Sequence, residues 1–269
     1  MRSRCPPRKN PLSCRNLSPG APASGARAMT RELLDALLAV LLAPSCGACN
    51  EPLLHPTRGC VCPDCWNGVI QIAPPICTHC GGHTNPANAA ATPPVCSHCV
   101  GATPAVSAAR AAGLHVGSLH AIVHALKYDG RRSLATPLAA LMRSAGAELI
   151  ESCDAVVPVP LHPSRRRERG FNQAEDLARH IGLPVVRALK RTRHTATQTA
   201  LPAAERQANV AGAFIAGRQA RQIRERTVLL IDDVRTTGAT LEACASALRE
   251  AGAREVCALT AARVETPGG

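Results

Sequence analysis

The sequence predicts an α/β fold in which a mostly parallel sheet is flanked by helices and preceded by a small cysteine-rich module. From about residue 105, short apolar runs alternate with helical patterns, as is typical of a doubly wound sheet. One run, 227–231, ends in two adjacent carboxylates followed by hydroxyl residues and a glycine. Nine of the fourteen cysteines lie between residues 46 and 99. The first observation predicts the sheet, the second a ligand site on it, and the third the module.

The N-terminal 28 residues are basic and lack apolar periodicity, so we expect them to be disordered. They contain six cations and no acid, so half of the net charge of +12 lies there. Because Met29 stands just before the first helical pattern, Arg31–Leu42, the tail is a candidate for a misassigned translation start. A secretion signal is disfavoured since Asp35 interrupts the apolar run.

The expected domain boundaries follow these changes in composition. The basic tail takes residues 1–30, the short helix and cysteine-rich module take 31–104, and the α/β domain takes 105–269. No apolar run is long enough to span a membrane. We therefore expect a cytoplasmic protein.

The cysteine-rich module carries four pairs of cysteines, each with two residues between its members. This spacing lets two thiolates of one turn reach the same tetrahedral zinc ion. Disulfides are disfavoured because a fourfold Cys-x-x-Cys repeat in a cytosolic chain is a metal pattern. An interleaved pairing stays open, but the simplest assignment is a double zinc ribbon with two structural Zn²⁺ sites, Cys46, Cys49, Cys62 and Cys65 for one, and Cys77, Cys80, Cys96 and Cys99 for the other.

Hydrophobic periodicity places the elements of the α/β domain. We expect strands at 108–116, 154–160, 184–187, 228–233 and 256–261. We expect helices at 119–128, 134–150, 171–181 and 241–251, the last with Leu241, Cys244, Ala245 and Leu248 on one face.

The segment 227–240 indicates a site for a ligand with sugar hydroxyls and a phosphate. Asp232 and Asp233 follow the strand, at the edge where open α/β sheets bind ligands. Two carboxylates there can hold a vicinal diol directly or through a metal ion. Backbone N–H groups and hydroxyls of the next turn suit a phosphate. The residues expected to bind it are Arg235, Thr236, Thr237, Gly238, Ala239 and Thr240.

This segment, an apolar strand followed by Asp-Asp, two residues and Thr-Thr-Gly-Ala-Thr, resembles the phosphoribosyl-pyrophosphate (PRPP) signature of type I phosphoribosyltransferases. Over roughly 31–264 the chain is similar to the ComF/GntX family, through Leu126–Gly130, Val157–Pro160, Arg169–Gln173 and 191–199, in that family's order after a cysteine module. The resemblance implies a type I phosphoribosyltransferase-like fold, PRPP with Mg²⁺ as ligand, and a link to DNA uptake in competence.

The proposed catalytic residues are Asp232 and Asp233, which would hold the ribose hydroxyls and stabilise positive charge on the ribose carbon. The departing diphosphate needs cations, and a long polar segment, 190–209, corresponds to the loop that closes over transferase sites. The candidate diphosphate contacts are Lys127, Arg165, Arg169, Arg191 and Arg193.

The leading function is thus a ComF-like phosphoribosyltransferase-domain protein that binds PRPP or a related sugar phosphate and acts in DNA uptake. One alternative is a non-catalytic accessory protein that binds single-stranded DNA and DNA-uptake proteins through the basic residues 165–169. Its weakness is the scarcity of stacking residues, since only four are Phe, Tyr or Trp. Another alternative is a nucleotide salvage transferase, although no base-binding segment is recognisable.

Overall fold

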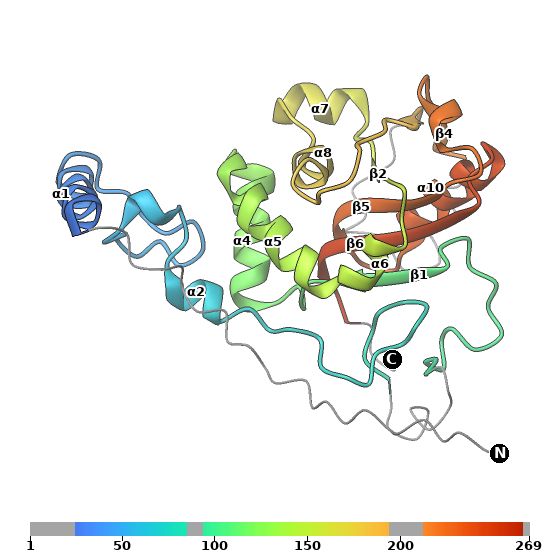
Figure 1. The fold of residues 1–269 in the computed structure, drawn as a ribbon, viewed down its shortest axis with the longest axis horizontal. Coiled ribbons are helices and arrows are strands. Elements are labelled where there is room, and N and C mark those ends of the chain that lie inside the picture. Colours follow the sequence, from blue (N-terminus) through green and yellow to red (C-terminus); the bar gives the residue numbers. More distant parts are fainter. Residues whose placement is uncertain (1–24, 85–93, 194–211, 266–269) are drawn as a thin grey trace, which may run out of the picture.

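A four-stranded parallel sheet forms the centre of the computed structural model, which describes residues 25–84, 94–193 and 212–265 (Figure 1). Its strand order is β1-β6-β5-β2, and every neighbouring pair is parallel. The strands are β1 (Ala108–Ala111), β2 (Ala155–Pro158), β5 (Thr227–Arg235) and β6 (Glu255–Arg263). This topology confirms the predicted parallel α/β fold.

Helices cover both faces of the sheet because alternate residues of a buried strand point to opposite sides. The helices of this domain are α4 (Gly117–Tyr128), α5 (Ala135–Ala145), α6 (Ala147–Glu151), α7 (Pro163–Arg169), α8 (Gln173–Ala178) and α10 (Ala239–Glu250), with 3₁₀ turns η2 (Arg132–Leu134) and η4 (Ala220–Ile223). On β5, Leu229 and Ile231 join a core with α4, α5 and α8, whereas Val228 and Leu230 join a core with α10. The apolar face predicted for the last helix is buried in this second core.

A separate antiparallel hairpin, β3 (Leu189–Arg191) with β4 (Phe214–Ala216), lies beside α10. The predicted closing loop, 190–209, begins in β3, and its residues 194–209 fall outside the described residues. None of the helices in the described ranges combines the length and the apolar character that a bilayer crossing requires.

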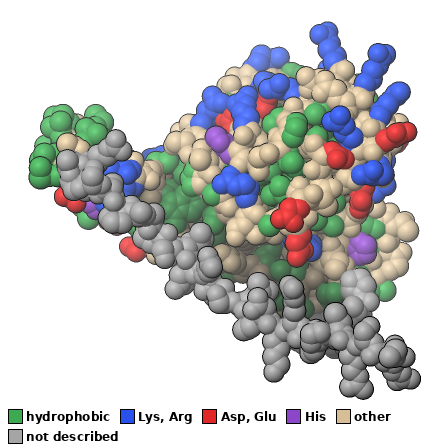
Figure 2. All heavy atoms as spheres, in the orientation of Figure 1, with side chains coloured by type: hydrophobic (Ala, Val, Ile, Leu, Met, Phe, Trp, Pro, Cys, Tyr) green, Lys and Arg blue, Asp and Glu red, His purple; other side chains and the backbone are tan. Residues whose placement is uncertain are grey.

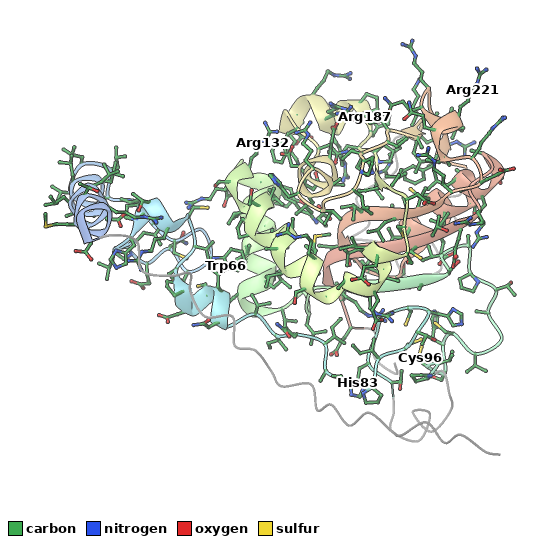
Figure 3. All side chains as sticks on the ribbon, in the orientation of Figure 1. Trp66, His83, Cys96, Arg132, Arg187 and Arg221 are labelled. Atoms are coloured by element: carbon green, nitrogen blue, oxygen red, sulfur yellow. The ribbon has the colours of Figure 1, made fainter. Side chains whose placement is uncertain are left out.

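The N-terminal module begins with α1 (Gly25–Leu42), followed by η1 (Pro56–Arg58) and α2 (Pro63–Asn67). The first helix packs on the segment that follows it, because Thr57 N–H donates to Asp35 Oδ1 at 2.8 Å. Trp66 packs at the core that the module shares with α4 (Figure 3). The opposite side of α1 is an apolar surface (Figure 2) that exposes Met29, Leu33, Leu34, Leu37, Val40, Leu41 and Leu42.

Several boundaries differ from the prediction. The helix expected at 134–150 breaks at Gly146, where a Cβ would lie 2.7 Å from a methyl carbon of Leu259. The basic residues 165–169, for which no helix was predicted, belong to α7, and α8 is shorter than the expected 171–181. The segment 184–187 forms only one bridge, Val185 to Val156. Helix α1 starts at Gly25, inside the tail expected to be disordered, while residues 1–24 lie outside the described residues.

The second half of the cysteine-rich module docks directly on β1. Gly81 has φ +67°, a conformation that favours glycine, and a Cβ there would overlap the carbonyl of Ala109. Arg110 also donates to the carbonyl of Thr78 at 3.2 Å. The turn between Cys77 and Gly82 therefore approaches the strand too closely for any side chain at residue 81.

We predict that Gly81→Ala destabilises the protein more than Gly101→Ala does. Both glycines have positive φ, +67° and +73°, but a Cβ at Gly101 meets nothing within 4 Å. The control therefore reports backbone strain alone, about 1 kcal/mol, whereas Gly81→Ala adds overpacking of about 1–3 kcal/mol. Thermal unfolding of the zinc-loaded variants measures the difference. Equal melting temperatures for the two variants would contradict the tight docking.

Candidate functional site

The two predicted carboxylates lie at the carboxyl end of β5, and one is buried against a cation. Asp233 is 4% exposed, and its Oδ1 lies 3.0 Å from Nζ of Lys127, at the end of α4. Its Oδ2 is buried and has no hydrogen-bond partner among the described residues. Leaving a buried polar atom unsatisfied costs about 1–3 kcal/mol. This oxygen is thus positioned to accept a hydrogen bond or a cation brought by a ligand.

The neighbouring Asp232 is half-buried, and its Oδ1 accepts the Asp233 backbone N–H at 2.9 Å. Burial, followed by the negative charge of Asp233, raises the pKa of Asp232 to about 7, against the opposing effects of Lys127 and Arg191. Burial raises the pKa of Cys244 in α10, and the negative charge of Asp232 is the second cause of this rise. Two adjacent residues thus give a carboxylate with a cation partner and a carboxyl that titrates near neutral pH.

The turn after β5 leads straight into α10. Gly238 has φ +86° and caps the helix, and Glu242 N–H donates to its carbonyl at 2.9 Å. Thr237 Oγ1 accepts the Ala239 N–H at 3.4 Å. The half-buried Thr236 and Thr240 flank this turn. The N-terminal N–H groups of a twelve-residue helix lie just beyond the carboxylates, an arrangement that suits a phosphate.

A pocket of about 350 Å³ lies next to the carboxylates. Lys127 connects the two, because it lines the pocket and binds Asp233. Arg169 donates to Gln173 Oε1 at 2.7 Å, and its guanidinium lies 5.0 Å from the ring centroid of Tyr128. The structure thus brings three diphosphate candidates to one pocket, whose lining is Lys127, Tyr128, Gly130, Arg165, Glu168, Arg169 and Phe171.

Helix α7, which supplies two of those arginines, has no buried residue of its own. It is tied to the neighbouring helix by an ion pair of 3.6 Å between Arg166 and Glu175. Glu175 and Asp176 of α8 are both buried. Lys and Arg side chains gather over this end of the molecule (Figure 2), where Arg132 and Arg187 are labelled (Figure 3). Among the described residues, the arginines paired with the two acids are Arg132, Arg166, Arg179 and Arg187.

Arg191 in the β3–β4 hairpin approaches the same site from the other side. Its guanidinium lies 5.3 Å from the ring centroid of Phe214. Burial lowers the pKa of Arg191, the positive charge of Arg165 lowers it further, and the negative charge of Asp232 acts in the opposite sense. Arg165 and Asp232 therefore both lie near enough to Arg191 for their charges to act on it. Arg193 is exposed, and its contact with a ligand stays a prediction.

Arg235 contacts the cysteine-rich module, which its position in the sequence did not suggest. Its Nη1 donates to the carbonyl of Cys80 in the cysteine-rich module at 2.9 Å, so its direct contact with a ligand also stays a prediction. The sequence reasoning missed Tyr128 and Gln173 as partners of Arg169. The spacing of His120, His124 and Tyr128 along one helix face was a signal that could have identified Tyr128.

The eight paired cysteines form two clusters in the sequential arrangement, so the simplest pairing is confirmed. The sulfur atoms of each cluster lie within 4.8 Å of one another. The Cys46–Cys65 and Cys80–Cys96 sulfur separations are 3.9 Å and 3.7 Å. Tetrahedral zinc–thiolate bonds place sulfurs about 3.8 Å apart. Both four-thiolate clusters therefore fit structural zinc.

Comparison with known families finds two matches along the chain. Residues 37–100 match the double zinc ribbon domain, and residues 167–267 match the phosphoribosyl transferase domain. Competence protein F of Haemophilus influenzae is 32% identical over 154 residues, which cover 54% of this chain and 67% of that protein. DNA utilization protein YhgH of Escherichia coli is 34% identical over 151 residues, covering 51% and 64%. The alignments thus span about two thirds of these relatives.

Solved structures similar to the chain include the following two. One is described as the allosteric regulatory enzyme of purine biosynthesis (23% identity, TM-score 0.32, covering 48% of this chain and 26% of that one). Another is a hypoxanthine phosphoribosyltransferase from Staphylococcus aureus (17% identity, TM-score 0.29, covering 47% and 62%).

We predict that Asp232→Asn stabilises the folded protein, and more so at pH 8 than at pH 5. The folded-state pKa of Asp232 is raised to about 7 from an ordinary value of 3.8. Between these values the unfolded chain ionises this group more readily than the folded protein does, so the wild type loses stability as pH rises. Asparagine carries no charge and does not share this loss. Urea unfolding at both pH values measures the difference in unfolding free energy between the variant and the wild type. A difference that is smaller at pH 8 than at pH 5 would contradict the assignment.

Proposed function

The chain belongs to the ComF/GntX family, and on this premise we propose that it binds PRPP with Mg²⁺ at the carboxyl end of β5 and contributes to DNA uptake. The observation that carries the proposal is the buried Oδ2 of Asp233, which has no partner among the described residues. A hydroxyl or a hydrated cation at this position would satisfy it. The names of relatives in competence and DNA utilization support the second part.

The charges around the site are complementary to this ligand. Asp232 and Asp233 offer acceptors for ribose hydroxyls or for Mg²⁺, a cation that prefers a few carboxylates together with phosphate oxygens. The turn at Thr236–Thr240 would receive the 5-phosphate at the start of α10. The diphosphate would bind beside the pocket, among Lys127, Arg165, Arg169 and Arg191.

The reaction open to such a site is transfer of the phosphoribosyl group. A nucleophile forms a bond to the ribose C1 while the C1–O bond to diphosphate breaks and the electron pair leaves with the diphosphate. The cations would stabilise that developing charge, and the carboxylates would stabilise positive charge on the ribose carbon. Mg²⁺, when bound, neutralises the diphosphate. Nucleotide salvage and other transfers differ in the acceptor, which a screen of nucleobases for diphosphate release would identify.

We predict that replacing both carboxylates weakens binding of Mg²⁺·PRPP about 100-fold or more, because each is proposed to contact the ligand. Isothermal calorimetry of Asp232→Asn with Asp233→Asn measures the loss. Asp154→Asn is the matched control, since this carboxylate accepts the Thr227 N–H at 2.9 Å, where β5 begins. Full affinity in the double variant would refute the proposal.

We also predict that Mg²⁺·PRPP binding releases protons below pH 7. The pKa of Asp232 is about 7 without ligand, and a bound cation or hydroxyl donor favours the ionised form. Binding therefore weakens as pH falls through 7. Calorimetry at pH 6.5 in two buffers of different ionisation enthalpy measures the proton count. The release should disappear in Asp232→Asn, and equal heats in both buffers for the wild type would contradict this role.

A second candidate function, binding of single-stranded DNA, is favoured by a row of rings along α4. We call this row, His115, His120, His124 and Tyr128, the α4 stripe. Successive ring centroids are 4.7, 6.4 and 4.7 Å apart. All but His115 are exposed, and the stripe ends at the guanidinium of Arg169. Stacking surfaces beside cations are the usual elements of single-strand binding.

We predict that His124→Ala with Tyr128→Ala weakens binding of a short single-stranded DNA, because stacking contributes about 1–3 kcal/mol per base. Fluorescence anisotropy measures the affinity. His83→Ala serves as the control, because His83 is an exposed histidine of the second ribbon (Figure 3). Unchanged affinity in the double variant would exclude the stripe as the binding surface.

A further inference from the structure

The second zinc centre, Cys77, Cys80, Cys96 and Cys99, contacts the strands that carry the ligand site. The carbonyl of Cys80 accepts Nη1 of Arg235 at 2.9 Å and Nη1 of Arg263 at 2.5 Å. These arginines face each other in the register of β5 and β6. A Cβ at Gly82 would lie 2.5 Å from the Arg263 guanidinium. One turn of the ribbon is therefore held by both strand ends.

The two guanidiniums need a negative counter-charge. Within the described part of the chain, neither Arg235 nor Arg263 forms an ion pair with a carboxylate. A zinc ion held by four thiolates has a net charge of about −2, which matches two arginines. The same turn therefore provides both a hydrogen-bond acceptor and the balancing charge when the metal is bound.

Arg235 also contacts the turn expected to bind phosphate. A Cβ at Gly238 would lie 3.0 Å from Nη2 and 3.1 Å from Nε of Arg235. Gly238 caps α10 with φ +86°. The guanidinium thus lies between the carbonyl of Cys80 and the residue that caps the helix, and it supports the turn from the side of the ribbon.

We propose that Arg235 is a positioning residue that couples zinc occupancy of the second centre to ligand binding at the turn Thr236–Thr240. Metal binding folds the cysteine turn and fixes the Cys80 carbonyl, which fixes Arg235 and through it Gly238. Without the metal, the acceptor of Arg235 is no longer fixed in place, and the turn loses its support. Because coupling is reciprocal, ligand at the turn stabilises zinc in this centre.

The first zinc centre provides an internal comparison. It is held instead by Arg131, whose Nη1 donates to the Ser45 carbonyl at 3.0 Å. A hydrogen bond of 3.4 Å also joins Cys60 Sγ and Ser133 Oγ. These contacts lead to the end of α4 and to η2, not to the turn after β5. Zinc in the first centre is therefore expected to respond much less to ligand at that turn.

The test follows zinc transfer from the full-length, fully loaded protein to a chromophoric chelator, with and without Mg²⁺·PRPP. Variants Cys49→Ser and Cys99→Ser assign the two kinetic phases to the first and second centres. We expect Mg²⁺·PRPP to slow release from the second centre about fivefold or more and to slow release from the first centre much less. Arg235→Met should abolish this protection, and Arg235→Lys, which retains a donor and a charge, should restore part of it.

The inference rests on the proposed PRPP binding, so calorimetry of the wild type runs beside the kinetics. Binding without any slowing of zinc release overturns the coupling and leaves the proposed function standing. Equal protection in Arg235→Met shows that the coupling does not pass through Arg235. Absence of binding to the zinc-loaded wild type overturns both proposals. If Arg235→Met does not fold, two measurements still test the coupling. One is zinc release from the wild type with and without Mg²⁺·PRPP. The other is a PRPP titration of Cys99→Ser, which is expected to bind at least fivefold more weakly.

Discussion

The contact between Lys127 and Asp233 is the interaction on which the site depends. It joins a helix of one layer to the end of the central strand and fills one oxygen of a buried carboxylate while the other has no partner among the described residues. A buried carboxylate is tolerated only when it is paired. The pair fixes the end of α4, and the pocket beside it is lined by the same lysine. Lys127 thus both stabilises the buried carboxylate of Asp233 and lines the pocket beside it.

Much of the site could be predicted because its residues are adjacent in sequence. The order of strand, Asp232, Asp233 and Gly238 is a local pattern with a local geometry, and so is the spacing within each cysteine pair. Contacts between distant segments were not accessible. Lys127 lies 106 positions before Asp233, and Cys80 lies 155 before Arg235. Composition and periodicity do not specify which distant side chains meet.

The errors in the predicted fold come from packing between distant segments and from local helix caps. The pattern at 134–150 reads as one helix because a single glycine barely disturbs it. The break occurs because Gly146 packs against Leu259, which belongs to another element. The basic residues 165–169 resemble an exposed loop, yet a histidine cap at residue 162 and a left-handed Gly170 enclose a short helix. Tertiary packing and caps decided these boundaries, and hydrophobic pattern alone did not.

The absence of buried residues in α7 has a consequence for selectivity. The carboxylates follow four fully buried apolar residues of β5, Val228–Ile231, so the base of the site is rigid. Arg165 and Arg169 stand on a seven-residue helix without a buried residue, and segments with few buried contacts open at low free energy. The wall of the site can therefore shift while its base stays fixed. For the sugar phosphate proposed above, this predicts a strict requirement for the ribose and tolerance toward the length and charge of the phosphate chain.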